Sequence, residues 1–168
     1  MNADELRALQ APLKDRYRDA PEAARITLTA KGALDDAHIA CKVETGRALA
    51  VAGLHPATGG SGLDLCSGDM LLEALVACAG VTCKAVATAL GLKLRAGEVS
   101  AEGDLDFRGT LGVDKQAPVG FTDIRLTFKL DADATPEQLD TLMKLTERYC
   151  VVLQTLKRPP TLSAGLAG

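Results

Sequence analysis

The stretch Asp69-Met70-Leu71-Leu72-Glu73-Ala74-Leu75-Val76-Ala77-Cys78-Ala79-Gly80 decides how this chain folds. The apolar run continues beyond it for about three further turns, which is too long for a strand and predicts a helix over Ser67–Leu90. Ser67 suits the N-cap, Asp69 suits the positive end of the helix dipole, and Gly91 suits the stop. The helix therefore places one cysteine, Cys78, among apolar neighbours.

Alternating residues before this helix predict strands. The segments Arg25–Ala30, Ala37–Glu44 and Arg47–Val51 each alternate apolar and polar side chains. Turn residues separate them, at Gly32–Asp36 and at Gly46. These features predict a three-stranded meander joined by hairpins.

The chain after the central helix carries two more strands and a second helix. Alternation over residues 99–107 and 124–130 predicts the strands, with a long loop over Gly109–Gly120 between them. The residues Thr135-Pro136-Glu137-Gln138 form a capping box with proline in the first position, which predicts a helix start. A last short strand is expected near Leu162, after two consecutive prolines.

Leucines at helical spacing predict a short amphipathic helix within residues 3–19, ended or interrupted near Pro12. We therefore expect an N-terminal helical extension over residues 1–22 and a main domain over 23–168. The main domain has the order βββ-α-ββ-α-β, in which hairpins dominate. This order predicts an α+β fold with an antiparallel sheet and two central apolar helices.

Composition excludes several classes of function. The 168 residues suggest one domain, and the net charge of −3 without a Lys/Arg run argues against binding to nucleic acid. The polar first residues do not resemble a signal peptide. The apolar run of the central helix is long enough to span a membrane, but Glu73, Lys84 and Lys93 interrupt it. We expect a cytoplasmic protein that binds no membrane.

Five cysteines, an odd number without a CxxC motif, fit a reducing compartment: Cys41, Cys66, Cys78, Cys83 and Cys150. Cys150 lies in the second helix, in Thr146-Glu147-Arg148-Tyr149-Cys150-Val151-Val152-Leu153. If both helices pack into one core, the sulfurs of Cys78 and Cys150 could meet as a redox pair. The alternative is that each is a small apolar residue of the core.

Other kinds of site are less well supported by the residues. A zinc site could be assembled on paper from one histidine and three cysteines: His55, Cys66, Cys78 and Cys150. No closely spaced pair of ligands anchors such a site. A Cys-His hydrolase needs a base, but His38 lies on a polar strand face and His55 lies in a loop read as flexible. The loop Gly59–Gly62 lacks the Lys-Ser/Thr of a phosphate loop. We therefore expect no metal and no cofactor.

The two cysteine segments together resemble the OsmC/Ohr family, the osmotically inducible and organic hydroperoxide resistance proteins. Leu71–Cys78 is similar to that family's Ala-rich central helix, which ends such a run in the reactive cysteine. Glu147–Leu156 resembles the segment around the family's second cysteine, near the end of a helix. The order of strands and helices also matches, over about residues 25–166.

The resemblance implies an intertwined homodimer with active sites at the subunit interface. It implies a peroxidase without haem, metal or flavin, in which Cys78 attacks an organic hydroperoxide and becomes a sulfenic acid. Cys150 would resolve this acid as a disulfide, which a dithiol reductant of lipoyl or thioredoxin type would reduce.

The family also has an acidic residue near the start of the central helix, which orients an arginine toward the reactive thiolate. Asp69 is closest to that place, while Glu73 is nearer to Cys78 but on another helix face. Arg47, at the start of the third strand, is our choice for the arginine. Val151 stands where the family often has proline after the second cysteine. The alternative function is a non-catalytic OsmC-like domain that binds a small apolar ligand or senses redox state.

Overall fold

The computed structural model of the protein describes residues 3–34, 41–43, 52–63 and 65–166. The main helices are α1 (Ala3–Asp19), α2 (Ser67–Ala89), α4 (Pro136–Tyr149) and α5 (Val151–Lys157), with a short α3 (Phe107–Thr110) and the 3₁₀ turns η1 (Pro21–Ala24) and η2 (Pro56–Thr58). The strands are β1 (Arg25–Leu34), β2 (Cys41–Val43), β3 (Ala52–Gly53), β4 (Leu65–Cys66), β5 (Lys93–Asp106) and β6 (Asp123–Asp133). These elements form an α+β fold with an antiparallel sheet, as the sequence predicts.

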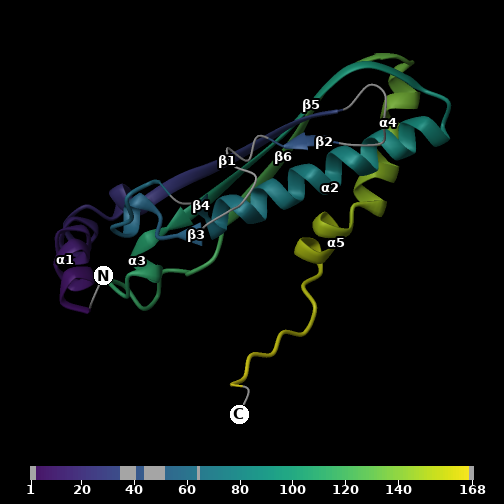
Figure 1. The fold of residues 1–168 in the computed structure, drawn as a ribbon. Coiled ribbons are helices and arrows are strands. Elements are labelled where there is room, and N and C mark those ends of the chain that lie inside the picture. The colour runs from purple at the N-terminus through teal and green to yellow at the C-terminus, as the bar shows by residue number, and fades with distance from the viewer. Residues whose placement is uncertain (1–2, 35–40, 44–51, 64, 167–168) are drawn as a thin grey trace.

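The sheet has four strands in the order β2-β1-β5-β6, and each neighbouring pair is antiparallel. Ile26 lies opposite Leu105 in the β1–β5 pair, and Gly103 lies opposite Ile124 in the β5–β6 pair. The long strands β1, β5 and β6 run beside α2 for most of its length (Figure 1). The sheet therefore offers one long apolar face to α2, and residues of α4 and α5 join the same core.

Helix α2 confirms the strongest prediction from the sequence, because it spans Ser67–Ala89. Its N-cap is Cys66, one residue before the expected Ser67, and no side chain caps it. A stripe of its side chains is buried, including Leu72, Leu75 and Val76. Together with Val99 and Ala101 of β5 these residues form the main core. Each large apolar side chain buried there stabilises the fold by about 1.5–3 kcal/mol.

The N-terminal helix α1 packs at the end of the molecule where α3 and η2 also lie (Figure 1). Tyr17 anchors it, because its buried hydroxyl donates a 2.7 Å hydrogen bond to the carbonyl of Ala57. The helix continues through Pro12, so the expected break is wrong. Tyr17 packs with Phe107 and Leu111 in a second small core, and tertiary packing of this kind offsets the weak helix propensity of proline.

The second predicted helix is two helices in the structure. The capping box at Thr135 and Gln138 starts α4 as expected, with both hydrogen bonds present. The helix then ends at Tyr149, and α5 starts at Val151 after one extended residue, Cys150. Leu142 of α4 packs with residues of α2 in a third core cluster. The break at Cys150 turns the chain so that α5 also reaches α2.

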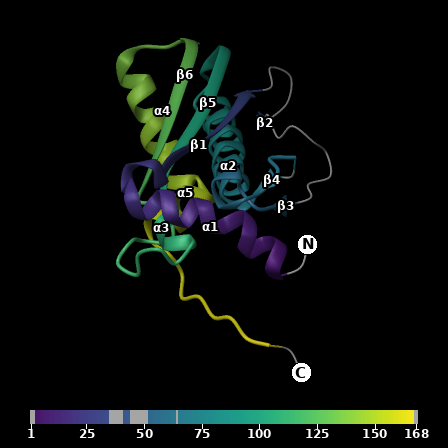
Figure 2. The same ribbon diagram turned by 90° about the vertical axis from the view of Figure 1, so that its left-hand side faces the viewer.

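Three strand predictions differ from the structure or lie outside it. Strand β1 runs through Leu34, so the turn expected from Gly32 onward does not begin there. The third strand expected over Arg47–Val51 lies outside the described residues, and the short β3 pairs in parallel with β4 instead of joining the meander. No strand forms near Leu162. Pro159 and Pro160 have no N–H to donate, and the tail extends away from the fold (Figure 2).

Candidate functional site

Cys78 lies on the side of α2 that turns toward α5. Leu71, Leu75 and Cys78 form one row on the helix, at the spacing i, i+4, i+7 that places side chains on the same face. Leu75 is fully buried, whereas Leu71 is partly exposed and Cys78 is half-buried. The row is thus deepest at its middle residue, Leu75, and Cys78 at its end is less deeply buried.

Cys150 lies at the break between α4 and α5. It is the C-cap of α4 and the N-cap of α5, with extended backbone angles of φ −71° and ψ 104°. Its N–H donates a 2.9 Å hydrogen bond to the carbonyl of Thr146, and its carbonyl accepts from the N–H of Gln154 at 2.9 Å. The side chain is fully buried in the main core. Two helices therefore fix the direction of this thiol.

The structure brings the thiols of Cys78 and Cys150 together. Burial is the largest cause that raises the pKa of the Cys150 thiol, to about 11, and the neighbouring Cys78 thiol raises it further. The backbone N–H groups of Leu153 and Val152 lower this pKa in part. The Cys150 side chain does not form a capping hydrogen bond at the start of α5. With a pKa of about 11, Cys150 keeps its proton at neutral pH.

An apolar groove of about 570 Å³ lies beside the two cysteines, between α2, α5 and the start of β6. Its apolar lining comes from Leu71, Leu75, Phe121, Ile124, Leu126, Leu153 and Leu156. Leu75 is one turn before Cys78 on α2, and Leu153 is one turn after Cys150 on α5, so the groove lining comes within one helix turn of each cysteine. A volume of this size suits a small ligand. The charged residues of the lining, Asp123 and Lys157, are exposed to solvent.

The structure does not bring Asp69 to the thiol pair within one chain. Asp69 is nine residues before Cys78, which is about 13.5 Å along a straight helix and about half a turn around it. Burial raises the pKa of the Asp69 carboxyl, and the nearby His55 lowers it in part. Burial also raises the pKa of Glu73, as does the charge of Asp69. Arg47 lies outside the described residues.

His55 is held firmly in place, so the interpretation of its loop as flexible is wrong. Its ring stacks on Phe107 with centroids 4.9 Å apart, and its Nδ1 accepts a 3.0 Å hydrogen bond from the N–H of Ala57. The backbone of Gly60 passes so close to the carbonyl of Leu54 that no Cβ fits there. The sequence signal for this order was the proline after His55, which suits the start of a 3₁₀ turn.

The remaining described cysteines lie apart from the pair. Cys83 is buried in the third core cluster, where burial raises the pKa of its thiol. Cys66 is half-buried at the start of α2, and both are free thiols. Within the described part of the chain, no three His, Cys, Asp or Glu side chains gather as metal ligands would. The zinc site considered from the sequence therefore has no counterpart there.

Helix α2 is long and apolar enough to cross a membrane by length and composition, over Ser67–Ala89. Core helices of soluble proteins have the same properties, and α2 packs on the sheet and on α4 and α5. Nothing in the described residues positively indicates a membrane protein.

Comparison with known proteins identifies the class. The OsmC-like protein family matches residues 60–164, which is more than half of the chain, and the protein belongs to this family. The fold is similar to the crystal structure of an OsmC-like hydroperoxide resistance protein from Jannaschia sp. CCS1, with a TM-score of 0.63 and 16% sequence identity. That similarity covers 86% of this chain and 95% of the other. None of the curated proteins matches the sequence.

Proposed function

We propose that the protein is a thiol-dependent peroxidase that reduces organic hydroperoxides. The observation that supports this most directly is that two free thiols, Cys78 and Cys150, lie next to each other in the main core, near residues that line an apolar groove. The membership in the OsmC-like family and the hydroperoxide resistance function named for the structural neighbour support a role related to peroxides.

The surroundings of the two thiols support different roles for them. Cys78 is half-buried and lies one helix turn after Leu75, which lines the groove, so we assign it the contact with a substrate bound there. Cys150 is fully buried, and its raised pKa keeps it a thiol at neutral pH, which is a poor nucleophile. We therefore assign the attack on the peroxide to Cys78 and the resolving step to Cys150.

The reaction then follows with its atoms balanced. The Cys78 thiolate attacks one oxygen of the O–O bond, which breaks to give a Cys78 sulfenic acid and, after protonation, the alcohol. The Cys150 thiol attacks the sulfenic sulfur, and its proton leaves with the hydroxyl group as water. A dithiol of lipoyl or thioredoxin type reduces the resulting disulfide. The closeness of the two thiols supports this step, since a disulfide needs Cα atoms within about 7 Å of each other.

The groove supports an organic substrate over hydrogen peroxide. Burial of apolar substrate surface against Leu71, Phe121 and Leu156 contributes roughly 25 cal/mol per Å², and hydrogen peroxide has no such surface. The same groove supports the second candidate function, a non-catalytic OsmC-like domain that binds a small apolar ligand or senses redox state. The two differ in whether peroxide oxidises Cys78 in turnover.

We also propose a homodimer in the cytoplasm. The membership in the OsmC-like family supports the dimer, and several large apolar side chains exposed on the described surface could be buried in a subunit interface: Leu63, Val119, Val151 and Leu162. Asp69 and Arg47 keep their proposed roles as the supporting acid and the cation for the Cys78 thiolate. Because Asp69 faces away from Cys78 in its own chain, its role requires a neighbouring subunit.

The test is peroxide consumption by single variants, with cumene hydroperoxide and a dithiol reductant. Cys78→Ser should abolish turnover. Cys150→Ser should consume about one equivalent of peroxide and then accumulate over-oxidised Cys78. Cys66→Ser is the matched control, because Cys66 is a half-buried free thiol at the N-cap of α2 and does not belong to the pair. This variant should reduce the peroxide at the normal rate. Full activity of Cys78→Ser would reject the proposal.

A further inference from the structure

A second cavity, of about 580 Å³, lies on the other face of the sheet from the thiol pair. Side chains alternate between the two faces of a strand. Ile26 and Leu105 pack toward the cores, so their neighbours Arg25, Thr27 and Asp104 lie on the opposite face. These three residues form one wall of the cavity, and the loop after α3 forms the other wall through Arg108, Asp114, Gln116 and Pro118.

The loop wall of this cavity is held rigidly. Asp106 is almost fully buried and accepts hydrogen bonds from Arg108 through its backbone N–H, Nε and Nη2, the last at 2.6 Å. Backbone hydrogen bonds tie Val113 back to Arg108. A Cβ on Gly109 would lie 2.4 Å from the carbonyl oxygen of Pro118, so the loop closes on itself at a glycine. The cavity is therefore preformed, which favours ligand binding.

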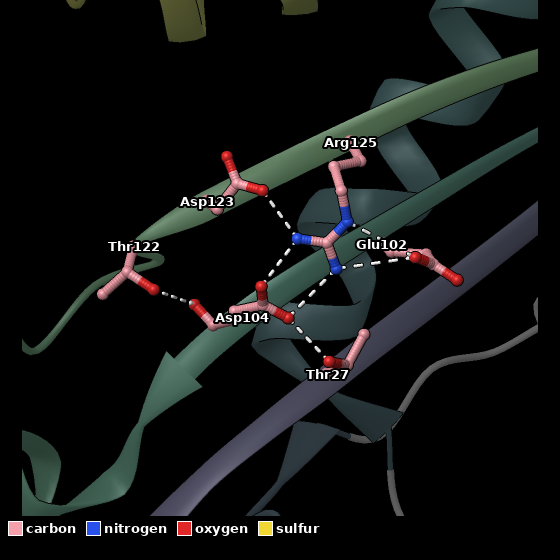
Figure 3. A network of polar contacts seen from close by, with 6 residues as sticks. All are labelled: Thr27, Glu102, Asp104, Thr122, Asp123 and Arg125. Carbon is pink, nitrogen blue, oxygen red and sulfur yellow. Dashed lines mark hydrogen bonds and ion pairs between the residues drawn. The ribbon is translucent and has the colours of Figure 1, made fainter.

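A hydrogen-bond network also holds the wall of the cavity that β1 and β5 form (Figure 3). Asp104 accepts 2.6 Å hydrogen bonds from Thr27 and from Arg125. The bonds to Arg125 are the largest cause that lowers the pKa of Asp104, to about 2, and those to Thr27 come next. The hydroxyl of Thr122 donates to the backbone carbonyl of Asp104. The Asp104 charge is thus compensated within the protein.

Among the described residues, one charge that lines the cavity has no close counter-ion, and a second has only a distant one. The guanidinium of Arg25 makes no hydrogen bond or ion pair there, and it acts on the buried Asp106 only through space. The carboxylate of Asp114 has Arg108 as its counter-ion, at the long distance of 3.4 Å. Arg108 is already paired with Asp106 at 2.6 Å. One wall therefore presents a free positive charge and the other a weakly compensated negative charge.

We propose that this cavity binds a small zwitterion, of the class of short peptides with free ends. The carboxylate of the ligand pairs with Arg25, and its ammonium group pairs with Asp114. The side chain of Gln116, also in the lining, donates to or accepts from the peptide groups between them. The volume is within the range of cavities that hold small molecules and exceeds what a single amino acid needs. The site is independent of the thiol pair.

The experiment is an NMR titration of the ¹⁵N-labelled protein with triglycine, acetyl-triglycine and triglycine amide. Triglycine should give saturable shifts at amides that line the cavity, and each single-ended analogue should bind about tenfold more weakly, as expected for the loss of one charged hydrogen bond. Absence of saturable shifts with millimolar triglycine overturns the proposal, as does equal binding of all three probes.

Two variants assign the ends. Arg25→Gln should weaken the binding of acetyl-triglycine, whose only charged end is the carboxylate. It should leave the affinity for triglycine amide unchanged. Asp114→Asn should weaken the binding of triglycine amide and leave the affinity for acetyl-triglycine unchanged. Asparagine keeps an oxygen that can accept the 2.9 Å hydrogen bond from the N–H of Gln116. Arg95→Gln is the matched control, because this exposed arginine pairs with Asp131 outside the cavity lining. Equal effects of all three substitutions on every probe would contradict the assignment. Peroxide turnover should be unchanged in each variant.

Discussion

The burial of Cys150 and its raised pKa lead to a prediction about alkylation by iodoacetamide. The pKa of Cys150 is raised from 9.0 to about 11, so at neutral pH its thiolate population is lower by about 100-fold, one factor of ten for each unit. Because the thiolate is the nucleophile, Cys150 in the native protein should react at least about 100-fold more slowly than in the unfolded chain. Its full burial slows the reaction further.

The assay is a timed pulse of iodoacetamide, followed by peptide mass spectrometry, with each peptide in denaturant as its own reference. Cys78 is half-buried and should be protected much less than Cys150. Labelling of Cys150 should rise about tenfold for each pH unit until the pH nears its pKa. Cys78→Ser should leave Cys150 protected, because burial is the leading cause of its raised pKa. A Cys150 that reacts within tenfold of its unfolded rate, or faster than Cys78, refutes the reasoning.

Three further predictions concern stability, the groove and pH. Tyr17→Phe removes a buried 2.7 Å hydrogen bond and should lower the free energy of unfolding by about 1 kcal/mol in urea titrations, whereas the same change at the exposed Tyr149 should have no effect. Gly103→Ala places a Cβ 2.5 Å from the ring of Phe121, so it should destabilise the fold by about 1–3 kcal/mol. The substitution should displace Phe121, which lines the groove, and so should also raise KM for cumene hydroperoxide. An unchanged KM would contradict the assignment of the groove as the substrate site. Because the unfolded Cys150 ionises near pH 9.0 and the folded one near 11, the free energy of unfolding should fall across that range, and less so in Cys150→Ala.

The sequence predicted the elements whose signals are local. The apolar run of α2 and the capping box at Thr135 need no information from elsewhere in the chain, and both are found where expected. The alternation in β5 and β6 is equally local, and the structure has strands there. The α+β fold with an antiparallel sheet followed from the order of these elements.

The features that the sequence did not predict depend on contacts between distant segments. The break at Cys150 has no glycine or proline to mark it, because Val151 follows. The continuation of α1 through Pro12 depends on the packing of Tyr17 against α3 and η2. The strand expected near Leu162 needed a partner strand, and none lies beside it in the described chain.

The candidate site was predicted in part. The sequence pointed to Cys78 and Cys150 as residues that could meet, and the structure places their thiols in contact. It gave no sign of the groove, whose lining comes from three separate elements. The distance of Asp69 from Cys78 follows from helix geometry alone, through a separation of nine residues. The rigid placement of His55 depends on Phe107, which is far away in the sequence.

The measurement that tests the central claim most directly is disulfide mapping after one equivalent of cumene hydroperoxide is added to the reduced protein. The proposed reaction of the thiol pair predicts rapid loss of two thiols and a crosslink between the peptides of Cys78 and Cys150. Folded protein that retains all its thiols, or that forms its disulfides only through Cys66 or Cys83, would contradict the proposed peroxidase.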